Sequence, residues 1–189
     1  MASDGLSDLS DLRELIARAD ERALAASGVA CLERCLPLLG DGIADPEALR
    51  PLWAALANGP ARWAGRLGEA RESLKGPPER DTGEPDSADA VRAMLEGAPA
   101  EWAAGPLRAW AEECSGTALA LHRRYGTGEA TDADPLTAGE LRRQIRVLEL
   151  LADGEGTAGL RQALNAATEG RRVLAAAVSR RARGGGSRP

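Results

Sequence analysis

Four side chains in this chain could bind a metal ion or act as nucleophiles: Cys31, Cys35, Cys114 and the single histidine, His122. Cys31 and Cys35 are four residues apart, so on a helix they share a face. The set has the composition of a Cys3His zinc site, but structural zinc favours C-x2-C spacing on loops, which is missing here. Cys31 and Cys35 also lie in an apolar run, where free cysteines are usually buried. We therefore expect buried structural thiols, no metal and no thiol chemistry.

The carboxylates do not indicate an acid–base pair, because most lie at predicted helix caps or on solvent-facing sides of predicted helices. Glu140 is the last residue of Thr137-Ala138-Gly139-Glu140, a capping-box pattern. One histidine is too few for the paired Glu-x-x-His ligands of di-iron bundles. No nucleotide-binding glycine motif occurs, and Gly126-Thr127-Gly128 is followed by an acidic loop. We expect no catalytic residue, no cofactor and no enzymatic activity.

Tryptophan and arginine indicate where a partner could bind. Tryptophan is enriched at binding hot spots, and the short segment around Trp102 need not be fully buried, although a core position is the alternative. Arginines gather towards the C-terminus, where the helix dipole also favours cations. A net charge of -5 and the lack of aromatic residues among these arginines argue against nucleic acid. The predicted interaction surface consists of Trp102, Arg171, Arg172, Arg180 and Arg181.

The elements that must position these residues are helices. Hydrophobic residues make up 43% of the 189-residue chain and charged residues 28%, a globular composition, while 3% aromatic residues imply a core of leucine and alanine. Apolar residues repeat at three and four positions almost throughout, and no segment alternates as a strand would. The pattern predicts an all-α bundle of seven to nine helices. Their expected ranges are 7–39, 46–57, 60–75, 87–96, 99–125 with a break at Gly105-Pro106, 137–152 and 158–181.

The first of these helices has two special features. Gly28 interrupts it, which indicates either a bend or a close helix crossing. After Gly28 only Glu33 and Arg34 are polar up to Leu39, and a helix that is apolar on so many sides is covered by neighbours. We therefore expect a central helix in this region.

The chain divides near its middle. Proline, glycine and charged residues fill 76–86, which predicts a flexible linker between an N-terminal half, 1–75, and a C-terminal half, 87–181, followed by a disordered tail, 182–189. The halves either pack separately or form a single domain.

The two halves share short patterns. Ser-Gly lies inside an apolar helix at Ser27-Gly28 and at Ser115-Gly116, and Asp-Pro and Leu-Arg follow in both cases. An internal duplication is one explanation. Chance matching in an alanine-rich sequence is the other.

Cysteine usage and hydropathy indicate the compartment. Three cysteines without disulfide-framework spacing suit a reducing cytoplasm. No apolar run reaches the length of a membrane span, and the acidic start of the chain is not a secretory signal. We expect a cytoplasmic protein with no membrane association.

One stretch resembles a known family. Residues 30–39 and 45–50, ACLERCLPLL and DPEALR, are similar to a helical segment in a family of bacterial immunity proteins, over about 20–25 residues. The resemblance implies an all-helical protein that binds a partner protein. The chain lacks the family's later histidine-rich segment, so no site residue is carried over. It also resembles small actinobacterial all-helical proteins of unknown function.

We therefore expect a non-enzymatic helical protein-binding module, such as an adaptor, a scaffold or an immunity-type factor. The alternative is a small-molecule-binding helical domain whose pocket is lined by tryptophan, drawn from Trp53, Trp63, Trp102 and Trp110. An enzyme that uses cysteines or carboxylates brought together by folding is the least favoured interpretation. Partner identity and oligomeric state do not follow from the sequence.

Overall fold

The computed structural model describes residues 2–40, 47–75, 86–126, 134–154 and 156–185, and within these ranges it is all-helical, without a strand. Eight α-helices are described, which confirms the predicted all-α bundle. They are α1 (Ala2–Arg18), α2 (Glu21–Cys35), α3 (Arg50–Asn58), α4 (Trp63–Ser73), α5 (Ser87–Glu96), α6 (Ala104–Tyr125), α7 (Pro135–Asp153) and α8 (Thr157–Gly185). Two short 3-10 helices, Leu36–Leu39 and Pro60–Arg62, precede α3 and α4.

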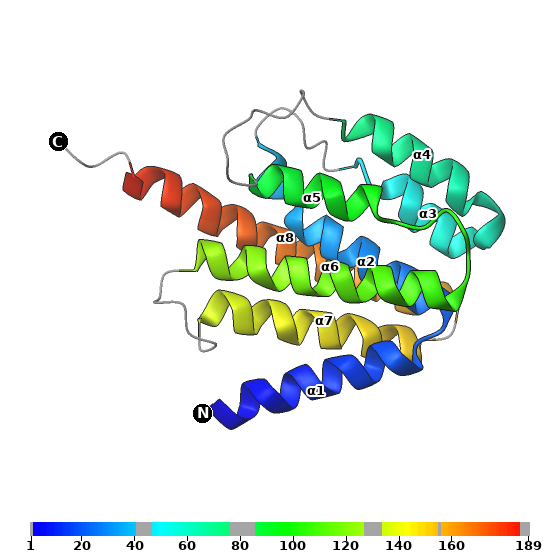
Figure 1. Ribbon diagram of the computed structural model, residues 1–189, viewed down its shortest axis with the longest axis horizontal. Helices are drawn as coiled ribbons and strands as arrows, with labels where there is room; N and C mark the ends of the chain where they lie inside the picture. Colours follow the sequence, from blue (N-terminus) through cyan, green and yellow to red (C-terminus); the bar gives the residue numbers. More distant parts are fainter. Residues whose placement is uncertain (1, 41–46, 76–85, 127–133, 155, 186–189) are drawn as a thin grey trace.

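Helix α2 lies at the centre of the molecule (Figure 1). It begins at its N-cap Asp20, whose carboxylate accepts a hydrogen bond from the backbone N–H of Ala23 at 2.8 Å. Every residue from Ala23 to Cys35 is buried, because α3, α5, α6, α7 and α8 all pack against this helix. The prediction of a central helix is confirmed.

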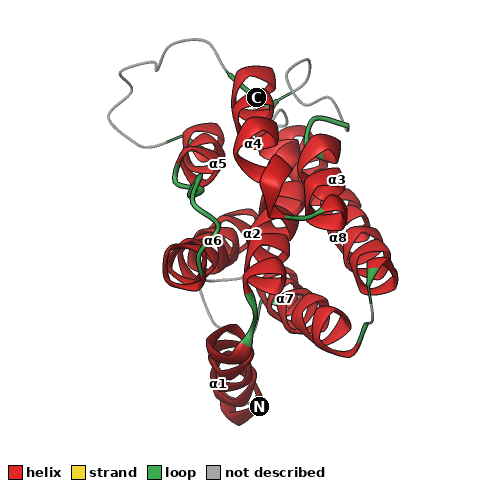
Figure 2. Cartoon of the chain, turned by 90° about the vertical axis from the view of Figure 1, so that its right-hand side faces the viewer, coloured by secondary structure: helices red, strands yellow, loops and turns green. Residues whose placement is uncertain are grey.

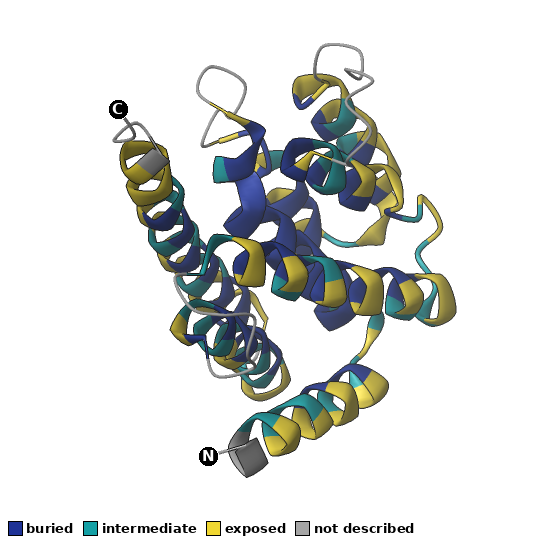
Figure 3. Cartoon of the chain, turned by 60° about the vertical axis from the view of Figure 1, so that its left-hand side comes forward, coloured by how far each residue is buried: buried dark blue, intermediate teal, exposed yellow. Residues whose placement is uncertain are grey.

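The remaining helices surround α2 on several sides. Helices α6, α7 and α8 make most of the contacts with α2. Helix α1 lies along α7 and α6 at one edge of the molecule, and α3, α4 and α5 lie towards the opposite edge (Figures 1 and 2). Buried faces point inwards on each helix and exposed faces outwards (Figure 3). One hydrophobic core runs through both predicted halves, because α2 from the first half packs directly on helices of the second.

Several predicted helix boundaries were wrong. The predicted first helix is two helices, α1 and α2, and Asp20 is the N-cap of α2. Helix α2 is not interrupted at Gly28. The expected helix from residue 99 begins only at Ala104, so Gly105-Pro106 lies inside the first turn of α6. The capping residue of α7 is Asp134, which accepts from the Thr137 backbone N–H at 3.0 Å, so Thr137 is already helical.

The C-terminal boundary was also wrong. Helix α8 continues to Gly185, so the first part of the predicted disordered tail is helical. The rest of that tail and the predicted linker up to residue 85 lie outside the described residues. The Leu-Arg matches behind the suggested duplication are not equivalent, since Leu49 caps α3 whereas Leu141 lies inside α7.

Gly28 marks a close helix crossing, one of its two predicted roles. The indole of Trp110 on α6 lies directly against its Cα, so that a Cβ at position 28 would lie 2.4 Å from the ring atom Cζ3. No real Cβ contact is that short, and the neighbour is a rigid aromatic ring buried in the core. The missing side chain therefore sets how closely α2 and α6 approach.

Gly28→Ala should reduce the free energy of unfolding by about 1–3 kcal/mol, because the added methyl group forces Trp110 and α6 away from α2. Chemical denaturation followed by tryptophan fluorescence measures this change. Gly116→Ala is the matched control, since Gly116 is an exposed glycine of α6 whose Cβ would meet no atom within 4 Å. It should stabilise the protein by about 0.4–1 kcal/mol. Equal effects of the two substitutions would contradict the close crossing.

Candidate functional site

A group of polar side chains lies inside the hydrophobic core. Arg34 of α2, Ser115 and His122 of α6, and Glu140 and Gln144 of α7 are all buried, and we call them the buried cluster. Arg34, His122 and Glu140 are 0% exposed. Ionisable groups rarely enter a core unless they are paired, so this cluster is the first place to look for chemistry.

The centre of the buried cluster is an ion pair between α2 and α7. The Nε of Arg34 donates to both carboxylate oxygens of Glu140, at 2.9 and 2.8 Å, and its Nη2 donates to the Cys31 sulfur at 3.2 Å. Burial alone would raise the pKa of Glu140, but the Arg34 charge, His122 and a hydrogen bond from Gln144 outweigh it and lower the pKa. Glu140 is therefore ionised inside the core.

Gln144 and Ser115 extend the cluster from α7 to α6. The Ser115 hydroxyl donates to the Gln144 side-chain oxygen at 2.6 Å, and the Gln144 amide donates to the Ser115 carbonyl at 3.3 Å. The same amide donates to Glu140 Oε1 at 2.9 Å. These bonds hold Gln144 in one orientation and join the neutral part of the cluster to the ion pair.

His122 is held so that one ring nitrogen makes a hydrogen bond and the other makes none within the described part of the chain. Its Nδ1 lies 2.7 Å from the Ala118 carbonyl, which can only accept, so Nδ1 carries the proton. Nε2 lies 3.4 Å from Glu140 Oε2 without a hydrogen bond among the described residues. Burial, together with the charges of Arg34 and Arg143, lowers the pKa of His122 despite the opposing effect of Glu140. The ring is neutral at neutral pH.

A second ion pair ties α2 to α8. Arg171 donates to Glu33 Oε1 at 2.6 Å, and the Glu33 side chain is 4% exposed. Burial raises the pKa of Glu33, against the lowering effect of Arg171. Adjacent residues of α2 thus pair with two different helices, Glu33 with α8 and Arg34 with α7.

The three thiols are free and buried. Burial raises the pKa of Cys31 to about 12 and raises the pKa values of Cys35 and Cys114 well above 9.0. Cys31 and Cys35 lie on α2 and Cys114 on α6, and these two helices pack against each other. The described residues contain no group of three His, Cys, Asp or Glu that could hold a metal ion. A thiol that stays protonated is a poor nucleophile.

Three tryptophans pack against one another. The rings of Trp63 and Trp102 meet edge to face with centroids 5.5 Å apart, and those of Trp63 and Trp110 with centroids 6.1 Å apart. The Trp63 indole N–H donates to the Pro99 carbonyl at 2.7 Å and that of Trp110 to the Met94 carbonyl at 2.7 Å. Both N–H groups are therefore already used within the fold.

The predicted interaction surface does not form one patch. Trp102 is half-buried just before α6, whereas Arg181 lies over the Tyr125 ring at the other end of α6, with its Cζ atom 5.6 Å from the ring centroid. These ends are about 33 Å apart at 1.5 Å per residue. Arg171 is half-buried in its pair with Glu33, and Arg172 and Arg180 are exposed.

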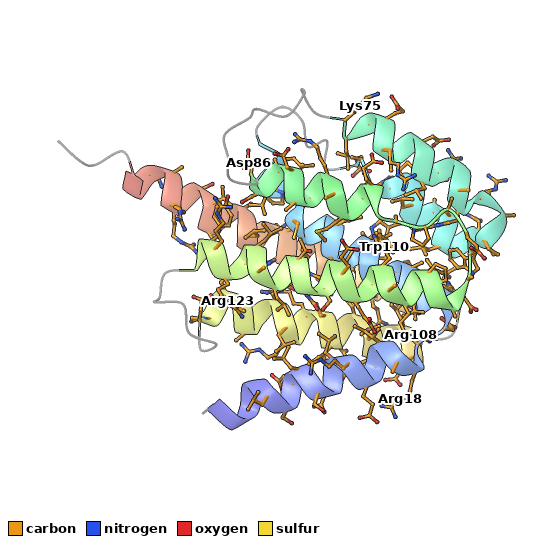
Figure 4. The ribbon with its side chains drawn as sticks, viewed as in Figure 1. Arg18, Lys75, Asp86, Arg108, Trp110 and Arg123 are labelled. Carbon is orange, nitrogen blue, oxygen red and sulfur yellow. The ribbon has the colours of Figure 1, made fainter. Side chains whose placement is uncertain are left out.

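The arginines at the ends of α6 and α8 lie together. Arg181 donates to the Arg124 carbonyl, which fixes the last turns of α8 beside the end of α6. Arg123 lies at this end of α6 (Figure 4). We call the exposed set the basic end: Arg123, Arg124, Arg180, Arg181 and Arg183. The sequence pointed to the α8 members but not to Arg123 and Arg124, which only the fold brings beside them.

Sequence reasoning missed the buried cluster. Glu140 was assigned to a helix cap, whereas it is buried and paired with a residue 106 positions away. The available signal was Glu33-Arg34, two charges inside an otherwise apolar helix. Such charges need buried partners, but the pattern does not say which ones.

No family model, curated protein or solved structure matches this chain. Its own residues are thus the basis for assigning a function. No helix in the described part of the chain is both long and apolar enough to cross a bilayer.

Glu140→Gln should destabilise the protein by about 3–5 kcal/mol, because it leaves the Arg34 guanidinium buried without a counter-charge. Urea denaturation followed by circular dichroism measures the change. Glu149→Gln on the same helix is the control, because its side chain is 45% exposed in its pair with Arg146 and should change stability by less than about 0.5 kcal/mol. Similar stabilities of the two variants would contradict a buried ionic link.

Stability should fall as the pH drops below 6.5. The folded pKa of His122 is lowered, so between that pKa and 6.5 the unfolded chain binds the proton and the folded chain does not. The stabilisation is complete above 6.5 and is lost as the pH falls to the folded pKa, with a slope of at most about 1.4 kcal/mol per pH unit. Denaturation curves at several pH values measure the slope.

His122→Leu isolates this contribution because His122 is the chain's single histidine. The variant should lose the extra slope just below pH 6.5, whatever its absolute stability. Glu33, whose folded pKa is raised, affects the pH dependence of stability in the opposite direction. It is present in both the wild-type protein and the His122→Leu variant, so it does not account for a difference between them. An unchanged slope in the variant would show that His122 titrates alike in the folded and unfolded chains.

Proposed function

We propose that this protein is a non-enzymatic protein-binding module that docks an acidic segment of another protein on its basic end. The carrying observation is that the adjacent ends of α6 and α8 carry five exposed arginines, in a chain whose net charge is -5. Helix α8 projects beyond the body at this end (Figure 1). A local charge opposite to the overall charge favours an oriented encounter with a complementary partner.

The buried cluster supports a binding role over a catalytic one. Its ionisable residues are enclosed by helices, so a substrate would need to open the core to reach them. Their hydrogen bonds hold α2, α6 and α7 together, which gives the exposed helix ends a rigid support. Rigid elements that carry exposed groups suit recognition because little order must be gained on binding.

A protein partner is favoured over nucleic acid at the basic end. Tyr125, the aromatic residue at this end of α6, is half-buried and has Arg181 over one face of its ring, so it offers a poor platform for base stacking. In the described part of the chain the single exposed large hydrophobic side chain is Leu6, at 70%. We therefore propose recognition by charge, with guanidinium groups binding carboxylates.

Arg180→Glu should weaken capture of the partner about tenfold, because it replaces attraction by repulsion at the exposed end of α8. Wild-type and variant proteins are used as baits for quantitative affinity purification from source-cell lysate, followed by binding of the purified partner at two salt concentrations. Arg161→Glu is the matched control, since it makes the same charge change at the exposed start of α8.

The two charge reversals separate the outcomes. Loss of a protein partner with Arg180→Glu, its retention with Arg161→Glu and weaker binding at high salt support the proposal. Equal losses from both variants would indicate an effect of net charge alone. If the captured protein is lost after nuclease treatment, the basic end binds nucleic acid and the proposal of a protein partner is wrong.

A further inference from the structure

Two buried arginine nitrogens are left without partners beside the Arg34–Glu140 ion pair. They are Nη1 of Arg34 and Nη1 of Arg143, and neither has a hydrogen-bond partner among the described residues. Arg34 is 0% exposed, and Arg143 is a half-buried residue of α7. A buried charged donor without an acceptor costs free energy, so each such atom requires an explanation.

Glycines bring the two arginines into one region. A Cβ on Gly170 of α8 would lie 2.5 Å from Cδ of Arg34 and 3.0 Å from Cδ of Arg143, so both side chains pass the same point of α8. A Cβ on Gly139 would lie 3.1 Å from the unpaired Nη1 of Arg143. Both guanidinium charges also lower the pKa of His122. The stems of the two arginines, one from α2 and one from α7, thus meet at the same point of α8.

The carboxylates of this region are already engaged. Both oxygens of Glu140 accept from Arg34 Nε, and one also accepts from Gln144. Glu33 is paired with Arg171 of α8. Arg34 and Glu140 neutralise each other, the histidine is neutral, and Arg143 has no ion pair among the described residues, which leaves one excess positive charge.

We propose that a small monovalent anion of halide size binds between Arg34 Nη1 and Arg143 Nη1. A water molecule could accept from both nitrogens, but only an anion also offsets the excess charge. The anion must be small, because both nitrogens are buried and the arginine side chains occupy most of the space beside Gly139 and Gly170. The half-exposed Arg143 side chain is the route to solvent. The bound anion would join α2, α7 and α8.

Halide-dependent stability tests this proposal. Thermal unfolding of the full chain is measured at constant ionic strength with chloride or bromide in place of gluconate, which is too large for the site. Binding to the folded state alone raises the melting temperature, and we expect about 2–4 °C. Crystals grown with bromide should show an anomalous peak within hydrogen-bond distance of both Nη1 atoms.

Arg143→Met separates this site from general salt effects. It keeps an apolar stem against Gly170 but removes one donor and the excess charge, so the halide-dependent shift should disappear. Arg146→Met is the matched control on the same helix, because the Arg146 side chain is 60% exposed in its pair with Glu149, and this variant should keep the shift.

Three results would overturn the proposal: no halide dependence in the wild-type protein, an equal shift in Arg143→Met, or a water molecule with no anomalous signal at the site. A bromide peak without any effect on melting would mark an adventitious ion only, and would also count against the proposal. None of these results bears on the basic end, which lies elsewhere on α6 and α8.

Discussion

The ion pair between Arg34 and Glu140 is the constraint on which the arrangement of helices depends. It places a full positive and a full negative charge inside a core built mainly of leucine and alanine. Desolvating two charges is costly, and the cost is offset only when the partners meet in good geometry. The central helix α2 must therefore keep one register against α7. Glu33, the preceding residue, imposes the same condition against α8 through Arg171.

The packing around this pair shows how small residues make room for large ones. Gly28 lets the Trp110 ring lie against the backbone of α2. In the same way, Gly170 lets the side-chain stem of Arg34 lie against the backbone of α8. In a core poor in aromatic residues, a few large side chains set the spacing between helices. Glycine on the facing helix is the complement that each of them requires.

The charged residues of this protein fall into a buried group and an exposed group, and the functional proposal follows from their different surroundings. The buried charges bind helices to one another and are closed to solvent, whereas the arginines at the ends of α6 and α8 face it. The unpaired arginine nitrogens lie between these extremes, since Arg34 is enclosed and Arg143 reaches the surface. In both proposals arginines of this protein bind negative charge: that of a protein partner at the surface, and that of a small anion inside the fold.

The sequence by itself determined the all-helical class, the central position of the helix around Leu32 and the burial of the three cysteines. These properties follow from local periodicity and from hydropathy, which are written along the chain. Asp20 is not recognisable as a cap because the apolar periodicity continues across it, and Asp134 competes with the capping-box pattern that begins at Thr137. Only the tertiary structure decided that Arg34 meets Glu140, that Trp110 fills the space at Gly28, and that Arg123 and Arg124 join the arginines of α8. Each of these contacts joins residues far apart in sequence, and the choice among many available partners depends on how whole helices pack.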